Sequence, residues 1–114
     1  MSEEEMDQNN VNALYNKGAA LLDQRNDQEA IEYFDRVLAI EPNATDALYN
    51  KGAALLDQGK NEEAIEYFDR VLAIEPNATD AADERGVALI PPEKSQYMQI
   101  SRRRKRRRSR RGWR

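Results

Sequence analysis

Carboxylates are the side chains of this sequence that come closest to forming a chemical site. Two acid-rich clusters recur at equivalent places, where they could be read as metal ligands. They are Asp27, Glu29 and Glu32, and Glu62, Glu63 and Glu66. Each cluster falls on an expected turn and helix start, where acidic side chains favour the positive end of the helix dipole. A bare carboxylate cluster is not specific for a metal, so we expect neither a metal site nor a cofactor.

The groups that usually carry catalysis are missing from the sequence. It contains no Cys and no His, which removes thiol chemistry, the commonest general base and the commonest metal ligand. Only four serines are present, two of them in the last 14 residues, and no base is available to activate them. The sequence therefore predicts a protein that is not an enzyme.

An arginine-rich arm forms the C-terminus, residues 101–114. Its ten cations and its one aromatic residue are Arg102, Arg103, Arg104, Lys105, Arg106, Arg107, Arg108, Arg110, Arg111, Trp113 and Arg114. Such a run binds RNA or DNA phosphates, and the indole can stack on a base. Three other interpretations stay open: targeting to the nucleus or an anionic membrane, docking on the chain's own acidic surface, and an unselected extension.

Charge is divided sharply along the chain. Residues 1–100 hold all 21 acids and eight of the 18 bases, which gives that part a net charge of −13. Residues 101–114 hold the other ten bases and no acid, a net charge of +10. This asymmetry is typical of an acidic body that carries a basic arm, although the total is only −3.

A 34-residue segment is written twice, at 13–46 and 47–80, with 30 of 34 positions identical. In each copy the apolar residues follow helical spacing over two stretches, which predicts a helical hairpin. Gly59 is placed for the left-handed conformation in the turn between the two helices, and Arg25 takes that place in the first copy. Asp27 and Asn61 are expected to cap the second helices. Pro42 and Pro76 are expected to end them.

Residues 79–90 begin a third copy, which Pro91-Pro92 interrupts before a second helix can start. Gly86 and Leu89 keep their places in this partial copy, whereas Asp83-Glu84-Arg85 replaces Tyr-Asn-Lys. One face of such a helix covers the end of a repeat stack while the other faces water. The pattern predicts a capping helix.

The repeat resembles the tetratricopeptide repeat family in period and pattern. The residues that match the family signature are Leu14, Gly18, Leu21, Ala30, Phe34, Val37 and Pro42, and then Leu48, Gly52, Leu55, Ala64, Phe68, Val71 and Pro76. The chain departs from the signature with Leu for the usual Trp, with Lys17 and Lys51 for Leu, and with Val for the third small residue. The resemblance implies an all-α fold, a short right-handed solenoid of helical hairpins with about five helices.

The expected organisation has five parts. They are an acidic disordered N-terminus (1–10), two repeats (11–44 and 45–78), a capping helix (79–90), and a disordered linker with the arginine-rich tail (91–114). Two and a half repeats are short of the roughly three that such stacks usually need, so a second copy could supply the missing neighbour. Self-association is therefore one expectation.

The resemblance also implies a peptide-binding groove, lined by the first helices of successive repeats. The residues expected to face it are Asn12, Tyr15, Asn16, Ala19, Asp23, Asp46, Tyr49, Asn50, Ala53, Asp57, Asp80, Asp83 and Glu84. Six carboxylates and no base are in this set. Chaperone-binding members of the family grip an acidic peptide with Lys, Asn, Asn, Lys and Arg. Of these five places only Asn50 matches, and Tyr15, Ala19, Asp80 and Glu84 hold the others.

The partner that suits this surface is a basic or amphipathic protein segment. Tyr15 and Tyr49 would be aromatic anchors, and Asn16 and Asn50 would donate hydrogen bonds to its backbone. The alternative is that these carboxylates are an ordinary solvated face. The sequence therefore predicts a non-enzymatic adaptor; the alternative function is nucleic-acid binding through the arm, with the repeats recruiting or self-associating.

The expected cellular location is inferred from the lengths of the apolar runs, the N-terminal composition and the arginine run. No apolar run is longer than four residues, as at Val37–Ile40 and its copy, so no membrane span is expected. The N-terminus is acidic where a secretory signal would be basic and then apolar. These features predict a cytoplasmic protein, or a nuclear one in a eukaryotic cell because of the arginine run.

Overall fold

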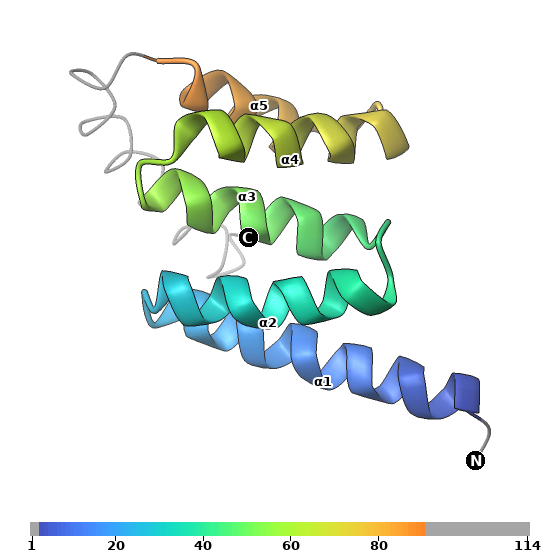
Figure 1. Cartoon of the computed structure of the whole chain (residues 1–114). Coiled ribbons are helices and arrows are strands. Elements are labelled where there is room, and N and C mark those ends of the chain that lie inside the picture. The colour runs from blue at the N-terminus through green and yellow to red at the C-terminus, as the bar shows by residue number, and fades with distance from the viewer. Residues whose placement is uncertain (1–2, 91–114) are drawn as a thin grey trace, which may run out of the picture.

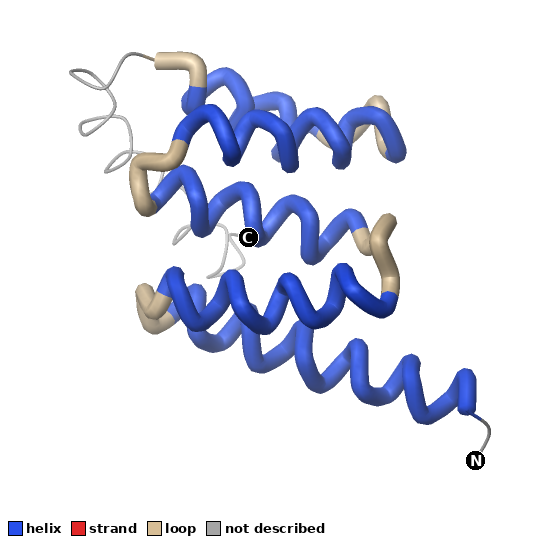
Figure 2. The backbone as a smooth tube through the Cα atoms, in the orientation of Figure 1, coloured by secondary structure: helices blue, strands red, loops and turns tan. Residues whose placement is uncertain are grey.

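Five α-helices follow one another in the computed structural model, which describes residues 3–90 (Figure 1). They are α1 (Glu3–Asp23), α2 (Asp27–Ile40), α3 (Thr45–Asp57), α4 (Asn61–Ile74) and α5 (Thr79–Ala88). Short turns join them, and the described part contains no strand (Figure 2). The expected all-α stack of helical hairpins is confirmed.

Helix α1 begins earlier than the sequence predicts. Disorder was expected for residues 1–10, whereas α1 runs from Glu3 and is 21 residues long. The segment before Val11 contains no Gly and no Pro, and three glutamates stand at its start. Glutamate is a good helix former and is favoured in a first turn by the helix dipole, so the helix continues past the repeat.

The turns inside the hairpins take the expected left-handed backbone. Arg25 has φ 66° and Gly59 has φ 82°. The expected caps are wrong, because α2 and α4 begin at Asp27 and Asn61 and the cap positions belong to Asn26 and Lys60. Neither cap residue makes a side-chain capping hydrogen bond.

The core of each hairpin is a phenylalanine set against a glycine. Phe34 and Phe68 are fully buried. A Cβ added to Gly18 would lie 2.8 Å from the Phe34 ring, and one added to Gly52 would lie 2.7 Å from the Phe68 ring. Glycine at these places lets the two helices approach closely, and any larger residue would push the ring aside. The same contact is therefore built twice.

The two cores interlock across the repeat boundary. Ala47 of α3 packs with Phe34 and Val37 of the first hairpin. Ile31 of α2 packs with Leu48 and Phe68 of the second. Each hairpin thus buries its apolar face against its neighbour, as a repeat stack requires.

Polar side chains join successive repeats in the same way at both junctions. Lys51 pairs with Asp35, and 34 residues later Arg85 pairs with Asp69, each at 2.5 Å. Burial alone lowers the pKa of Lys51, but hydrogen bonds to Asp35 and to the Tyr67 hydroxyl raise it overall, so this side chain stays charged. The stack therefore has a repeating ion pair that fixes the register of each first helix on the preceding second helix.

Candidate peptide-binding pockets

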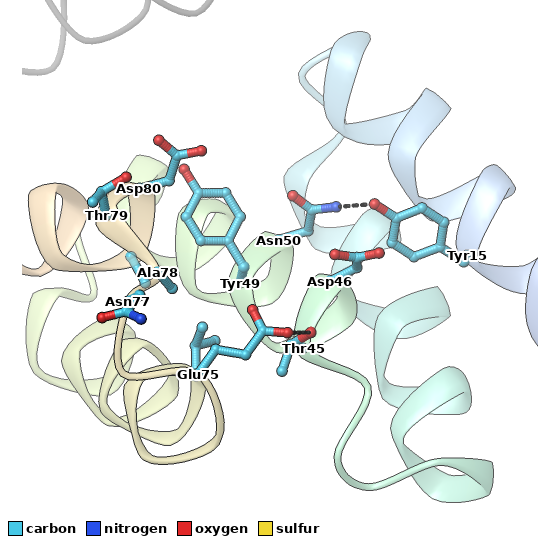
Figure 3. Close-up of a pocket in the computed structure, with 12 residues that line it drawn as sticks. Tyr15, Thr45, Asp46, Tyr49, Asn50, Glu75, Asn77, Ala78, Thr79 and Asp80 are labelled. Carbon is cyan, nitrogen blue, oxygen red and sulfur yellow. Dashed lines mark hydrogen bonds between the residues drawn. The ribbon is translucent and has the colours of Figure 1, made fainter.

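A pocket of about 330 Å³, here the C-terminal pocket, opens where α3, α4 and α5 meet (Figure 3). It is lined by Tyr15, Thr45, Asp46, Tyr49, Asn50, Val71, Glu75, Asn77, Ala78, Thr79, Asp80 and Ala81. The N-terminal halves of α3 and α5 and the turn between α4 and α5 supply most of this lining, because that turn brings these helix ends together.

A second pocket, the N-terminal pocket, is the same site one repeat earlier. It has a volume of about 350 Å³. It is lined by Val11, Asn12, Tyr15, Val37, Glu41, Asn43, Ala44, Thr45, Asp46 and Ala47. Each of these positions lies 34 residues before a position that lines the C-terminal pocket. The sequence duplication has therefore produced two equivalent pockets in a row.

Both pockets are acidic. Glu41 and Asp46 line the N-terminal pocket, whereas Asp46, Glu75 and Asp80 line the C-terminal one. Neither lining includes a Lys or an Arg. The extra carboxylate of the C-terminal pocket arises because Asp46 stands where the first copy has Asn12. Asp46 lines both pockets.

The two tyrosines form the walls of the C-terminal pocket. The Asn50 Nδ2 donates a hydrogen bond of 2.9 Å to the Tyr15 hydroxyl. Thr45 Oγ1 donates one of 3.3 Å to Glu75, and Asp46 and Asn50 lie between the two rings in Figure 3. Burial raises the pKa of Tyr15, and the nearby Asp46 carboxylate raises it further, against the lowering effect of the Asn50 hydrogen bond. The phenol is therefore protonated at neutral pH and keeps a proton to donate.

The structure brings together about half of the residues expected in the groove. Those that line a pocket are Asn12, Tyr15, Asp46, Tyr49, Asn50 and Asp80. Asn16, Asp23 and Asp83 are exposed elsewhere on the first helices, and Ala19 and Asp57 are half-buried there. The remaining two are buried.

The sequence prediction that Ala53 and Glu84 face the groove is wrong. Ala53 is 1% exposed and Glu84 is 6% exposed, so neither contributes open surface. Glu84 occupies the place of Asn50 at the next junction, and its carboxylate accepts a hydrogen bond of 3.5 Å from the Tyr49 hydroxyl. The carboxylate is therefore used inside the α3–α5 junction.

The inter-repeat turns supply pocket residues that sequence reasoning missed. Glu41 and Asn43 line the N-terminal pocket, and Glu75 and Asn77 line the C-terminal one. The signal was present, because the turn Glu-Pro-Asn-Ala-Thr-Asp is repeated without change.

Three further sequence predictions concern the arm, membrane spans and metal sites. The arm residues proposed to bind nucleic acid, 102–114, lie outside the described residues. Between residues 3 and 90, no helix is both long enough and apolar enough to cross a bilayer. The same part of the chain holds no group of three acidic residues arranged to bind a metal ion.

Comparisons with known proteins agree with this architecture. The tetratricopeptide repeat family model matches residues 4–45 and 15–81. A solved structure described as a MamA RS-1 ArsTM double mutant superposes with a TM-score of 0.67 at 28% sequence identity. The match covers 70% of this chain and 45% of that chain, so this chain spans under half the length of its structural relative. No curated protein matches. With its two matching hairpins, this chain belongs to the tetratricopeptide repeat family.

Proposed function

We propose that this chain is a non-enzymatic adaptor that binds a basic or amphipathic segment of a partner protein in its two acidic pockets. Tetratricopeptide repeats generally mediate protein–protein interaction or scaffolding. The observation that carries the proposal is the pair of equivalent pockets, lined by four different carboxylates and no base. A repeated acidic pocket suits a ligand with basic side chains at two places.

The chemistry of the pockets matches a lysine or arginine side chain. Asp46, Glu75 and Asp80 can neutralise its charge, and charge-assisted hydrogen bonds to carboxylates are the stronger kind. Tyr15 and Tyr49 offer flat apolar faces to its methylene stem or to a neighbouring apolar residue. The C-terminal pocket, with three carboxylates, is expected to bind the basic side chain more tightly than the N-terminal one.

Binding can be mapped with two synthetic octapeptides, one alternating Arg and Leu and the other Glu and Leu. We expect the basic peptide to shift the backbone amide signals of Asn43, Asp46, Asn77 and Asp80 in a ¹⁵N correlation spectrum of the full chain. The shifts should shrink between 50 and 500 mM salt because the contacts are ionic. The acidic peptide should leave these four signals in place. If the basic peptide moves only signals outside the two pockets, the binding site lies elsewhere.

Nucleic-acid binding through the arm is the second candidate function. Ten cations within residues 101–114 would release many counterions from RNA or DNA, so affinity should fall steeply with salt. Deleting residues 101–114 should abolish binding to a single-stranded RNA 20-mer in a filter or anisotropy assay. Capture of the Arg-Leu peptide should survive the deletion. RNA binding by the truncated chain would contradict this assignment.

A further inference from the structure

The first helix of the stack carries a contact surface that nothing covers in the described part of the chain. We call Ala13, Lys17 and Ala20 the leading face of α1. Both alanines are exposed. The same positions of α3 are Ala47 and Ala54, and each is 0% exposed. Identical residues are thus buried in the second repeat and bare in the first.

The reason for the difference is the neighbour on which α3 packs. Ala47 belongs to the core of the first hairpin, and Lys51 pairs with Asp35 of α2. Helix α1 has no preceding repeat among the described residues. Its segment 13–24 is nevertheless identical to 47–58 of α3. The leading face is therefore a complete copy of a surface that packs on a second helix.

The surface that matches the leading face lies on α4, in the second repeat. Residues 63–74 of α4 are identical to 29–40 of α2, the helix on which α3 packs. Asp69 stands where Asp35 stands. A second copy's α1 placed on α4 would reproduce most of the α2–α3 interface, with Lys17 on Asp69. Glu62 stands where Gln28 accepts a hydrogen bond from Gln58. The two surfaces therefore match in charge and shape, because the same kind of contact joins α2 and α3 within the chain.

In the structure α5 packs on this surface of α4, but its residues differ in part from those with which α3 packs on α2. Arg85 pairs with Asp69, and Ala88 is buried at 4% exposure in the place of Ala54. However, Ala82 stands where α3 has Leu48, and the buried carboxylate Glu84 stands where α3 has Asn50. Less apolar area and a buried carboxyl group both weaken packing. With ten residues against 13, α5 is also the shorter helix.

We infer that the leading face of one copy docks on α4 of another by displacing α5, so that the chain assembles head to tail. Helix α5 is then an internal competitor, whose advantage is the high effective concentration that covalent attachment gives it. The contact is heterologous and does not use the same surface twice, so it builds open rows of copies rather than a closed dimer. Displacing α5 would also remove Thr79, Asp80 and Ala81 from the lining of the C-terminal pocket.

Ala88 and Ala20 allow a direct test, because they occupy the same place in their repeats. Ala88→Arg in the full chain should unseat α5 and expose α4. We expect sedimentation velocity to show self-association at a concentration at least tenfold lower than for the unmodified chain. An Ala88→Arg chain that stays monomeric over a hundredfold concentration range would overturn the inference.

The second variant distinguishes this specific contact from nonspecific association. Adding Ala20→Arg to Ala88→Arg should return the chain to a monomer, since an arginine cannot fit where Ala54 is fully buried in the internal interface. The matched control adds Ala39→Arg, an exposed position of α2 that stays exposed with α3 in place. That control should associate like Ala88→Arg alone. Equal association of the Ala20 and Ala39 variants would show that the leading face is not the docking surface.

A charge exchange tests the register. In the Ala88→Arg background, Lys17→Asp alone and Asp69→Lys alone should each weaken association roughly fivefold, because each puts like charges at the contact. A mixture of the two variants should associate as the background does, since both possible contacts then join opposite charges. Failure of the mixture to recover would refute the Lys17–Asp69 register.

Discussion

Replacing Phe68 by Ala is expected to cost about 3–5 kcal/mol of unfolding free energy. The ring is fully buried, fills the space that Gly52 leaves, and lies 5.8 Å from the Tyr49 ring. The glycine that faces the ring has no side chain that could fill the hole. A small repeat array has a total stability near the low end of the 5–15 kcal/mol range, so most of it would be lost.

Urea unfolding followed by circular dichroism at 222 nm measures the effect. Ile74→Ala in the same helix is the matched control, since Ile74 is 42% exposed and its truncation should cost below about 1 kcal/mol. Phe34→Ala should resemble Phe68→Ala, because the first repeat makes the same glycine–phenylalanine contact. Similar midpoints for the Phe68 and Ile74 variants would mean that the hairpin core is not the main source of stability.

The fold was predictable because the same sequence pattern occurs in two nearly identical copies. Apolar spacing set the two helices of each hairpin, and a proline just past each second helix set where it ends. The left-handed turn was also predictable, and Arg25 adopts it despite its Cβ, with φ 66°. Here the surrounding hairpin outweighs the local preference for glycine. A doubled pattern therefore identified elements that a single copy would have left ambiguous.

Helix starts were less predictable than helix ends. Glu3–Asn10 shows no apolar period, so the sequence pattern predicted disorder, yet a segment without Gly or Pro can extend an existing helix. The expected caps failed by one position, since Asp27 and Asn61 lie inside their helices. Side chains that suit a cap also suit a first turn, so residue type alone does not fix the boundary.

The site was predictable only in part, because its residues come from different repeats. Periodicity on one helix correctly grouped Tyr49 with Asn50 and Asp46. It could not show that Glu75, at the end of the next helix, would meet them, since that depends on how the hairpins stack. It also could not show that Glu84 would be drawn into the α3–α5 junction by Tyr49. Periodicity places a residue on a face; only packing shows what covers that face.

Asp46→Lys should weaken binding of the basic Arg-Leu octapeptide more than any other single charge reversal among the described residues. Asp46 is the one carboxylate that lines both pockets, so its reversal puts a cation into each of them at once. An exposed ion pair is worth up to about 1 kcal/mol, and reversal replaces attraction with repulsion. Over two pockets we expect a ten- to thirtyfold rise in Kd, measured by fluorescence anisotropy at 100 mM salt.

Glu62→Lys is the control that isolates the pocket effect. Glu62 is exposed in the first turn of α4, as Asp46 is in the first turn of α3, so both variants lose the same favourable contact with a helix N-terminus and change net charge equally. Glu62 lines neither pocket. A general loss of attraction between acidic body and basic peptide would raise Kd to the same extent in both variants. A loss confined to Asp46→Lys, at unchanged helicity, would mean that the duplicated pockets, and not the overall charge of the chain, recognise the partner.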